Sequence, residues 1–130
     1  MSKTVFIIDD DPVLRLIVEK MLSKIDSSLV FIPCENGKIG LDKLNYHLED
    51  SSECIIFLDL NMPVLDGWGF LDEMESRQLS TYQNITLYIL SSSTDKRDIE
   101  RSKQYSFITK FYHKPLRNSD IIEIFEYQVN

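Results

Sequence analysis

The sequence predicts an α/β fold in which one five-stranded parallel sheet is covered by helices on both faces, giving three layers. Two observations predict it: five short apolar runs recur along the chain, and helical patterns alternate with them through short connections. Right-handed crossovers between parallel strands place the helices on both faces of the sheet. With 130 residues and 43% hydrophobic composition, the chain has the size of one domain.

The five apolar runs are the predicted strands, at residues 5–8, 29–32, 55–58, 85–90 and 107–112. They are rich in β-branched and aromatic residues, which favour strands. Each run is apolar almost throughout, which is typical of strands that are covered on both faces. We therefore expect every strand to be buried between two helical layers.

The first predicted helix carries the clearest signals. Asp11 is placed to cap it, Pro12 occupies its first position, and apolar residues follow at 3.6-residue spacing as far as Ile25. Later helices are predicted at 39–48, from about Trp68 onwards, at 95–105 and after a cap at Asn118. Ile99 is the only aliphatic residue in 95–105, so this helix has little to bury and is expected to be loosely held.

The composition excludes several function classes. The net charge of −7 repels nucleic-acid phosphates and anionic lipids, so neither nucleic acid nor membrane is an expected partner. No segment approaches ~18 continuous apolar residues and the N-terminus lacks the flanks of a signal peptide, which predicts a cytoplasmic location. Cys34 and Cys54 lack metal-binding or redox spacing and are expected to be buried, reduced thiols.

Polar residues interrupt the apolar pattern where the predicted strands end. They are Asp9 and Asp10 after the first strand, Asp59 after the third, Ser91 after the fourth and Lys114 just beyond the fifth. The carboxyl ends of parallel strands share one edge of the sheet, and ligands bind there. Taken alone, Asp9 and Asp10 fit loop or capping roles better than a metal site. Together with Asp59 and Lys114, they make a shared metal site the better interpretation.

Three carboxylates that converge repel one another and have raised pKa values unless a cation lies between them. Oxygen ligands without a convergent histidine or cysteine favour Mg²⁺. A carboxylate can attack phosphorus to form an aspartyl phosphate, provided that the charge on the phosphoryl oxygens is neutralised. The residues thus predict a magnesium site with phosphoryl chemistry.

Five separated motifs resemble the receiver domain of two-component response regulators, in the family's order and over nearly the whole chain. They are FIIDDDP at 6–12, FLDLNMP at 57–63, DG at 66–67, ILSS at 89–92 and KP at 114–115. The resemblance implies a flavodoxin-like (βα)5 fold with strand order 2-1-3-4-5, known for this fold, and a single receiver domain over residues 1–130.

The resemblance also implies roles in the acidic pocket. Asp59 is implied to be the phosphoacceptor. Asp10 is implied to ligate Mg²⁺ directly, Asp9 mainly through water, and Asn61 through its backbone carbonyl.

The remaining implied roles concern the response to phosphorylation. Ser91 is implied to hydrogen-bond a phosphoryl oxygen, Lys114 to pair with Asp59 or its phosphate, and Phe111 to be the switch aromatic. Serine replaces the commoner threonine at 91, which removes a methyl that helps to fix the rotamer. Phenylalanine replaces tyrosine at 111, which removes a hydroxyl. Many receivers have a cis bond before the proline of Lys114-Pro115.

The function implied is that of a single-domain response regulator in a two-component or phosphorelay system. It would accept a phosphoryl group on Asp59 from a sensor histidine kinase or a phosphotransfer protein and signal to a downstream protein target through a conformational switch. It would catalyse only its own phosphorylation and slow dephosphorylation. We expect a monomer or a weak, phosphorylation-dependent dimer.

Two alternatives remain open at the level of sequence. One is a magnesium-dependent small-molecule phosphohydrolase that uses an aspartyl phosphate; such enzymes usually have a second acid two positions after the nucleophile, where this chain has Asn61, and a cap domain. The other is a receiver-like domain that acts by protein contact alone, which the intact set of acids, hydroxyl and lysine disfavours.

Overall fold

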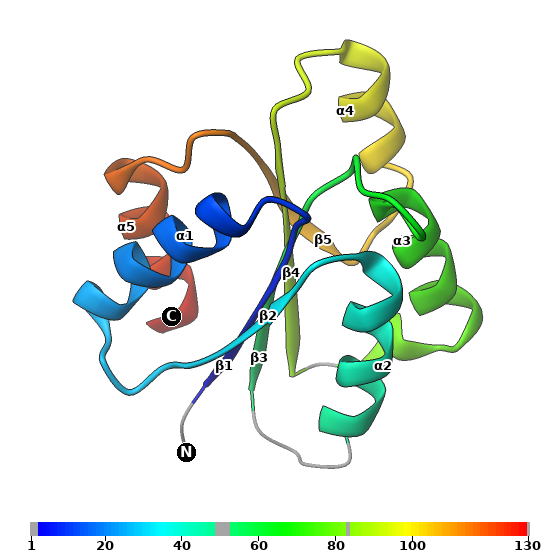
Figure 1. Ribbon diagram of the computed structural model, residues 1–130. Coiled ribbons are helices and arrows are strands. Elements are labelled where there is room, and N and C mark those ends of the chain that lie inside the picture. The colour runs from blue at the N-terminus through cyan, green and yellow to red at the C-terminus, as the bar shows by residue number, and fades with distance from the viewer. Residues whose placement is uncertain (1–2, 49–52, 83, 130) are drawn as a thin grey trace.

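The computed structural model describes residues 3–48, 53–82 and 84–129. Strands and helices alternate along the chain (Figure 1). The elements are β1 (Thr4–Ile8), α1 (Pro12–Ile25), β2 (Val30–Cys34), α2 (Gly37–His47), β3 (Cys54–Leu58), α3 (Gly67–Ser76), the 3-10 turn η1 (Leu79–Thr81), β4 (Ile85–Ser91), α4 (Lys96–Ser102), β5 (Ile108–His113) and α5 (Asn118–Val129). In the described part of the chain, no helix combines the length and apolar character needed to span a bilayer.

The strands form one parallel sheet in the order β2-β1-β3-β4-β5. Helices α1 and α5 cover one face, and α2, α3 and α4 lie on the other (Figure 1). The three-layer prediction is confirmed, and so is the strand order that the resemblance implied. With β1 in second place, β1 and β3 are neighbours in the middle of the sheet, although α1, β2 and α2 separate them in sequence.

The central strands divide the core between the two faces. All five residues of β1 and of β3 are buried. Phe6 and Ile8 belong to the core beneath α2 and α3, whereas Val5 and Ile7 belong to the core beneath α1 and α5. Successive side chains of a strand point to opposite faces, so an unbroken apolar run supplies both cores.

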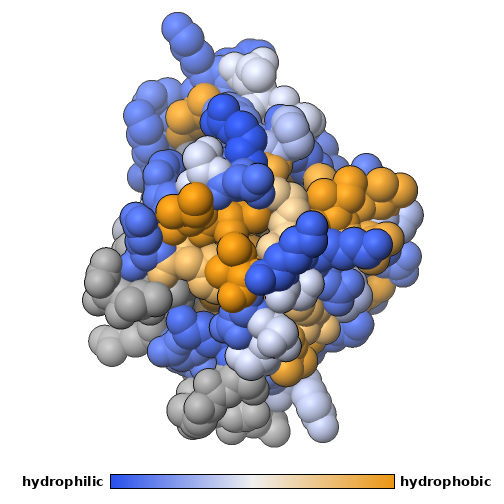
Figure 2. Space-filling model, turned by 90° about the vertical axis from the view of Figure 1, so that its left-hand side faces the viewer, coloured by the Kyte–Doolittle hydropathy of each residue, from blue (hydrophilic) through white to orange (hydrophobic). Residues whose placement is uncertain are grey.

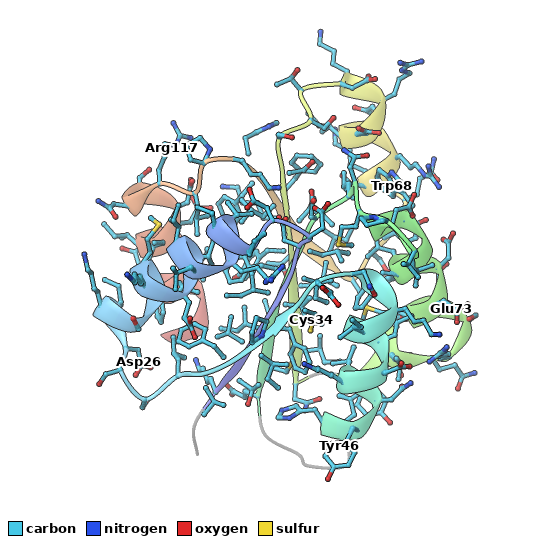
Figure 3. All side chains as sticks on the ribbon, viewed as in Figure 1. Asp26, Cys34, Tyr46, Trp68, Glu73 and Arg117 are labelled. Carbon is cyan, nitrogen blue, oxygen red and sulfur yellow. The ribbon has the colours of Figure 1, made fainter. Side chains whose placement is uncertain are left out.

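Both cysteines are free and buried, as the sequence predicted. Figure 3 labels Cys34, at the end of β2. Burial raises the pKa of Cys34 to about 11 and that of Cys54 to about 12. Both therefore remain protonated at neutral pH and behave as small apolar side chains.

The edge strands correct one expectation. We expected every strand to be covered on both faces, but β2 has one buried residue in five, and Val30 is 49% exposed. Strand β5 is also largely open, with Tyr112 as its only buried residue. An edge strand has a single neighbour and lies beyond the centre of the helical layers, so apolar character overstated its burial.

The helix starts follow local capping chemistry. The Asp11 carboxylate accepts the N–H of Val13 at 2.9 Å, which confirms the predicted cap of α1. The predicted cap of the last helix is wrong by one residue, because Asn118 is already the first residue of α5. There the Asp120 carboxylate accepts the N–H of Arg117 at 2.9 Å, so the third residue of the helix satisfies the cap position.

Helix α4 is shorter than the 95–105 predicted and spans seven residues. Of these seven, all described, only Ser102 is buried, and Ile99 is half-buried. The helix stands at the end of the molecule where the strands terminate (Figure 1). Its scant burial agrees with the expectation of a weakly packed helix.

Candidate functional site

The candidate site lies at the carboxyl edge of the two central strands. Asp9 follows β1 and Asp59 follows β3, and these strands are paired in the sheet. The N–H of Asp59 donates to the carbonyl of Ile8 at 2.9 Å, and the N–H of Asp9 donates to the carbonyl of Cys34 at 3.0 Å. The ladder thus fixes the backbone of both acids.

The structure brings together the three acids that the sequence singled out. Asp9, Asp10 and Asp59 each offer a carboxylate oxygen, and these oxygens lie within 4.8 Å of one another. Asp9 and Asp59 are 2% and 5% exposed, whereas Asp10 is exposed. Three hard oxygen donors, one of them open to solvent, fit a divalent cation that keeps part of its water shell.

Lys114, which follows the edge strand β5, adds a positive charge to the cluster. Its Nζ lies 2.8 Å from Asp9 Oδ2 and 3.5 Å from Asp59 Oδ1. Its N–H donates to the carbonyl of Ser91 at 2.9 Å, and its peptide bond to Pro115 is cis. The resemblance implied the pair with Asp59; the structure shows an additional, shorter pair with Asp9.

The electrostatics of the pocket favour a positive ligand. Burial, and then the charge of Asp9, raise the pKa of Asp59 from 3.8 to about 6, although Lys114 and the N–H of Asn61 act in the opposite direction. Burial alone would lower the pKa of Lys114, but the carboxylates of Asp9 and Asp59 raise it. Lys114 therefore does not fully offset the effects of burial and of Asp9 on the pKa of Asp59. The sequence predicted a raised pKa, but from the converging acids, and burial is the larger cause.

Ser91 ends β4 and is fully buried. Its Oγ accepts the N–H of Ser93 at 3.1 Å, and the Ser93 hydroxyl donates to Asp98 Oδ2 of α4 at 2.6 Å. The hydroxyl at 91 is therefore connected to α4 through one residue. Its contact with a phosphoryl group on Asp59 stays a prediction, as does the metal contact of the Asn61 carbonyl.

Phe111, the implied switch aromatic, lies on the edge strand β5. It is half-buried and packs against the core beneath α2 and α3, with its ring centroid 5.1 Å from that of His113. It also lines a groove of about 340 Å³ beside α4, together with Ile99. A role in switching stays a prediction.

Arg15 is a residue that the sequence analysis missed. It lies on α1, and its Nη1 donates to the backbone carbonyl of Asp9 at 2.6 Å. This contact ties the first turn of α1 to the strand end that carries two of the acids. The available signal was its spacing of one helical turn after the cap Asp11, which directs the side chain back towards the site.

The sequence matches the response regulator receiver domain over residues 5–126. It is 30% identical over 96 residues to the nitrate/nitrite response regulator protein NarL of Escherichia coli K12, covering 74% of this chain and 41% of NarL. It is 31% identical over 111 residues to the sensor histidine kinase CheAY of Helicobacter pylori, covering 85% of this chain and 13% of CheAY. The chain thus spans less than half the length of these relatives.

Solved structures share the fold. A CheY-like response regulator receiver domain protein from Methanospirillum hungatei superposes with a TM-score of 0.73 at 26% identity, covering 97% of this chain and 93% of the other. A two component response regulator from Cytophaga hutchinsonii gives a TM-score of 0.87 at 22% identity, covering 98% and 97%. These likenesses, with the match over residues 5–126, leave the phosphohydrolase alternative without support. The chain belongs to the response regulator receiver domain family, the module of two-component signalling that histidine kinases phosphorylate and that acts on downstream partners.

Proposed function

We propose that this chain is a phosphoacceptor and that Asp59 is the residue phosphorylated, in the cytoplasm, by a sensor histidine kinase or a phosphotransfer protein. The observation that carries the proposal is the arrangement of Asp59: a buried carboxylate at the end of a central strand, grouped with Asp9 and Asp10 and paired with Lys114. A carboxylate held in this way is a nucleophile with neutralising groups already in place.

In the transfer step, a carboxylate oxygen of Asp59 attacks the phosphorus of the donor. An O–P bond forms while the N–P bond of the phosphohistidine breaks, and the imidazole nitrogen that leaves keeps the electron pair and takes up a proton. The ammonium group of Lys114 pairs with Asp9 and Asp59, so it is placed to pair with the phosphoryl oxygens once they are bound to Asp59. The hydroxyl of Ser91 would supply a further hydrogen bond.

The acids fit Mg²⁺ as the cation of this site. Asp10 and Asp59 would bind it directly, with Asp9 acting through water and Asn61 through its carbonyl. When bound, Mg²⁺ supplies positive charge that neutralises the phosphoryl oxygens. The raised pKa of Asp59 supports this assignment. Burial and the charge of Asp9 destabilise the ionised carboxylate, and a bound cation would offset that destabilisation.

The phosphodonor is proposed to dock on α1. Val13, Leu16 and Ile17 are 63%, 50% and 49% exposed, on a helix that begins directly after the acids of the site. Figure 2 shows apolar side chains gathered on the side of the molecule formed by α1 and α5. An apolar helix face beside a phosphoacceptor suits a helical protein that carries the phosphohistidine.

The test is intact mass after incubation with acetyl phosphate and Mg²⁺, with and without a chelator, for wild type and Asp59→Asn. We expect a metal-dependent gain of one phosphoryl group, about 80 Da, in wild type alone. Equal labelling of Asp59→Asn would refute the assignment. On common phosphate esters we expect no sustained turnover, because the aspartyl phosphate is the product and is lost slowly.

A further inference from the structure

Side chains of α4 and of the segment that follows it contact α3. The guanidinium of Arg101, in the last turn of α4, lies 4.3 Å from the ring centroid of Trp68. Trp68 is in the first turn of α3 and is 8% exposed; Figure 3 labels it between the two helices. A cation over the face of a buried indole is an attractive contact.

Tyr105, three residues beyond α4, adds two contacts to the same helix. Its ring stacks on Trp68 with centroids 6.1 Å apart and an interplanar angle of 28°. Its hydroxyl donates to Asp72 Oδ1 at 2.6 Å, and Tyr105 is 8% exposed. Burial and the Asp72 carboxylate both raise the pKa of Tyr105, so the donor keeps its proton. We call Arg101, Tyr105, Trp68 and Asp72 the α3–α4 clasp.

The other end of α4 is connected to the candidate site. Asp98 accepts the Ser93 hydroxyl at 2.6 Å, and the N–H of Ser93 donates to Ser91 Oγ at 3.1 Å. A Ser91 hydroxyl that turns towards a phosphoryl group moves away from Ser93 and weakens this connection. The contacts of the clasp then remain as a restraint on α4.

We propose that the α3–α4 clasp sets how readily phosphorylation shifts α4, by stabilising the arrangement in which Ser91 is bonded to Ser93. This inference rests on the proposed function of Asp59. A phosphoryl group favours the arrangement in which Ser91 has turned towards it. Contacts of the clasp that are made only while Ser91 is bonded to Ser93 stabilise the other arrangement, and they therefore reduce the apparent affinity for the phosphoryl group. Removing one contact of the clasp therefore tightens the binding of a phosphoryl group or its mimic.

The test uses beryllofluoride with Mg²⁺ as a phosphoryl mimic, titrated by calorimetry. Tyr105→Phe keeps the stacked ring and removes only the hydroxyl that donates to Asp72. We expect it to bind the mimic about twofold to tenfold more tightly than wild type, the factor to which the net worth of one hydrogen bond converts. Arg101→Gln, which removes the cation over Trp68, is expected to act in the same direction.

The matched control is Tyr46→Phe, on α2, where the tyrosine is 82% exposed. It is expected to bind the mimic as wild type does. Trp68 is the only tryptophan of the chain, so its fluorescence reports on the clasp directly. Saturating mimic is expected to change the emission of wild type, since Arg101 and Tyr105 then shift relative to the indole.

The outcomes separate this proposal from the function on which it rests. If wild type is labelled by acetyl phosphate and binds the mimic, but Tyr105→Phe and Arg101→Gln bind it equally or more weakly, the clasp is only structural and the proposal is wrong. Unchanged Trp68 emission on saturation also overturns it. If wild type neither takes up label nor binds the mimic, the phosphoacceptor function itself fails, and the clasp proposal with it.

Discussion

At the scale of single residues, the structure holds two residues in unfavourable states. One is a buried carboxylate, and the other has an unfavourable backbone conformation. Asp59 is ionised at neutral pH although burial and Asp9 raise its pKa to about 6. Val64, in the loop between β3 and α3, has a φ of 71°, which a β-branched residue rarely adopts. Functional sites are where such costs are commonly found, and Asp59 belongs to the proposed site.

The first prediction concerns Asp59 and pH in the absence of divalent cations. Its pKa is about 6 in the folded chain against an ordinary 3.8, so the folded state binds more protons between these values. Stability is therefore lost as pH rises from about 4 to 6. Asp59→Asn removes this loss and should be more stable than wild type at pH 7.5, by about 1–2 kcal/mol after allowance for solvent screening.

Urea unfolding in chelator at pH 4 and 7.5 measures this difference, which should vanish at the lower pH. Asp26→Asn is the control, because hydrogen bonds from Ser28 lower the pKa of Asp26 and its contribution to stability is lost as pH falls. That variant should show no gain at pH 7.5. A destabilised Asp59→Asn at pH 7.5 would contradict the electrostatic account.

The second prediction concerns Val64. Its side chain is 77% exposed, so it gains little by burial, while its left-handed backbone costs roughly 1–2 kcal/mol. Glycine adopts this conformation freely but loses more entropy on folding. Val64→Gly should therefore raise the free energy of unfolding by about 0.5–1 kcal/mol. Val64→Ala, which keeps the unfavourable φ, should gain almost nothing; equal gains in both variants would refute the role of the backbone.

At the scale of elements, α1 carries the proposed docking face. Leu16→Glu places a charge on this face at a half-exposed position and leaves the acids untouched. We expect phosphotransfer from a histidine kinase or phosphotransfer protein that labels wild type to fall about tenfold or more, as at a central interface residue. Labelling by acetyl phosphate should not change.

The control for α1 is Tyr46→Glu, which changes an exposed residue on α2, on the other face of the sheet. It should retain most of the transfer from the protein donor. Loss of labelling by acetyl phosphate in Leu16→Glu would indicate damage to the site, and undiminished transfer from the protein donor would remove α1 from the docking surface.

Much of this arrangement could be predicted from the sequence because it depends on local order. Asp9 and Asp59 stand where apolar runs stop, and the ends of parallel strands share one edge, so their meeting followed from the pattern. The shorter ion pair of Lys114 with Asp9 could not be predicted, since it depends on the side-chain conformations within the pocket. The contact of Tyr105 with Asp72 joins residues 33 positions apart, and no periodicity indicates it.

At the scale of the whole molecule, the acidic pocket connects cation binding to global stability. A ligand that binds only the folded chain stabilises it by RT ln(1 + [L]/Kd), about 1.4 kcal/mol at ten times Kd. We expect Mg²⁺ to raise the thermal midpoint of wild type, since it relieves the repulsion among the three acids. The gain should be absent in Asp10→Asn.

Differential scanning calorimetry with Mg²⁺ or chelator measures this effect at constant ionic strength. Asp42→Asn, at an exposed position on α2 outside the acidic pocket, is the control and should respond as wild type does. A midpoint that rises equally in Asp10→Asn would show that the ion acts elsewhere on this acidic chain.

The exposed edge of β2 has a consequence for how the molecule behaves beside its own copies. The N–H of Val30 donates to Lys3 of the neighbouring chain segment, so by strand alternation the nitrogen of Pro33 faces outward. Proline has no hydrogen to offer there, and an incoming strand would meet a gap in the row of donors. An apolar edge strand that could otherwise pair with the strands of other copies is thereby made a poor template for such pairing.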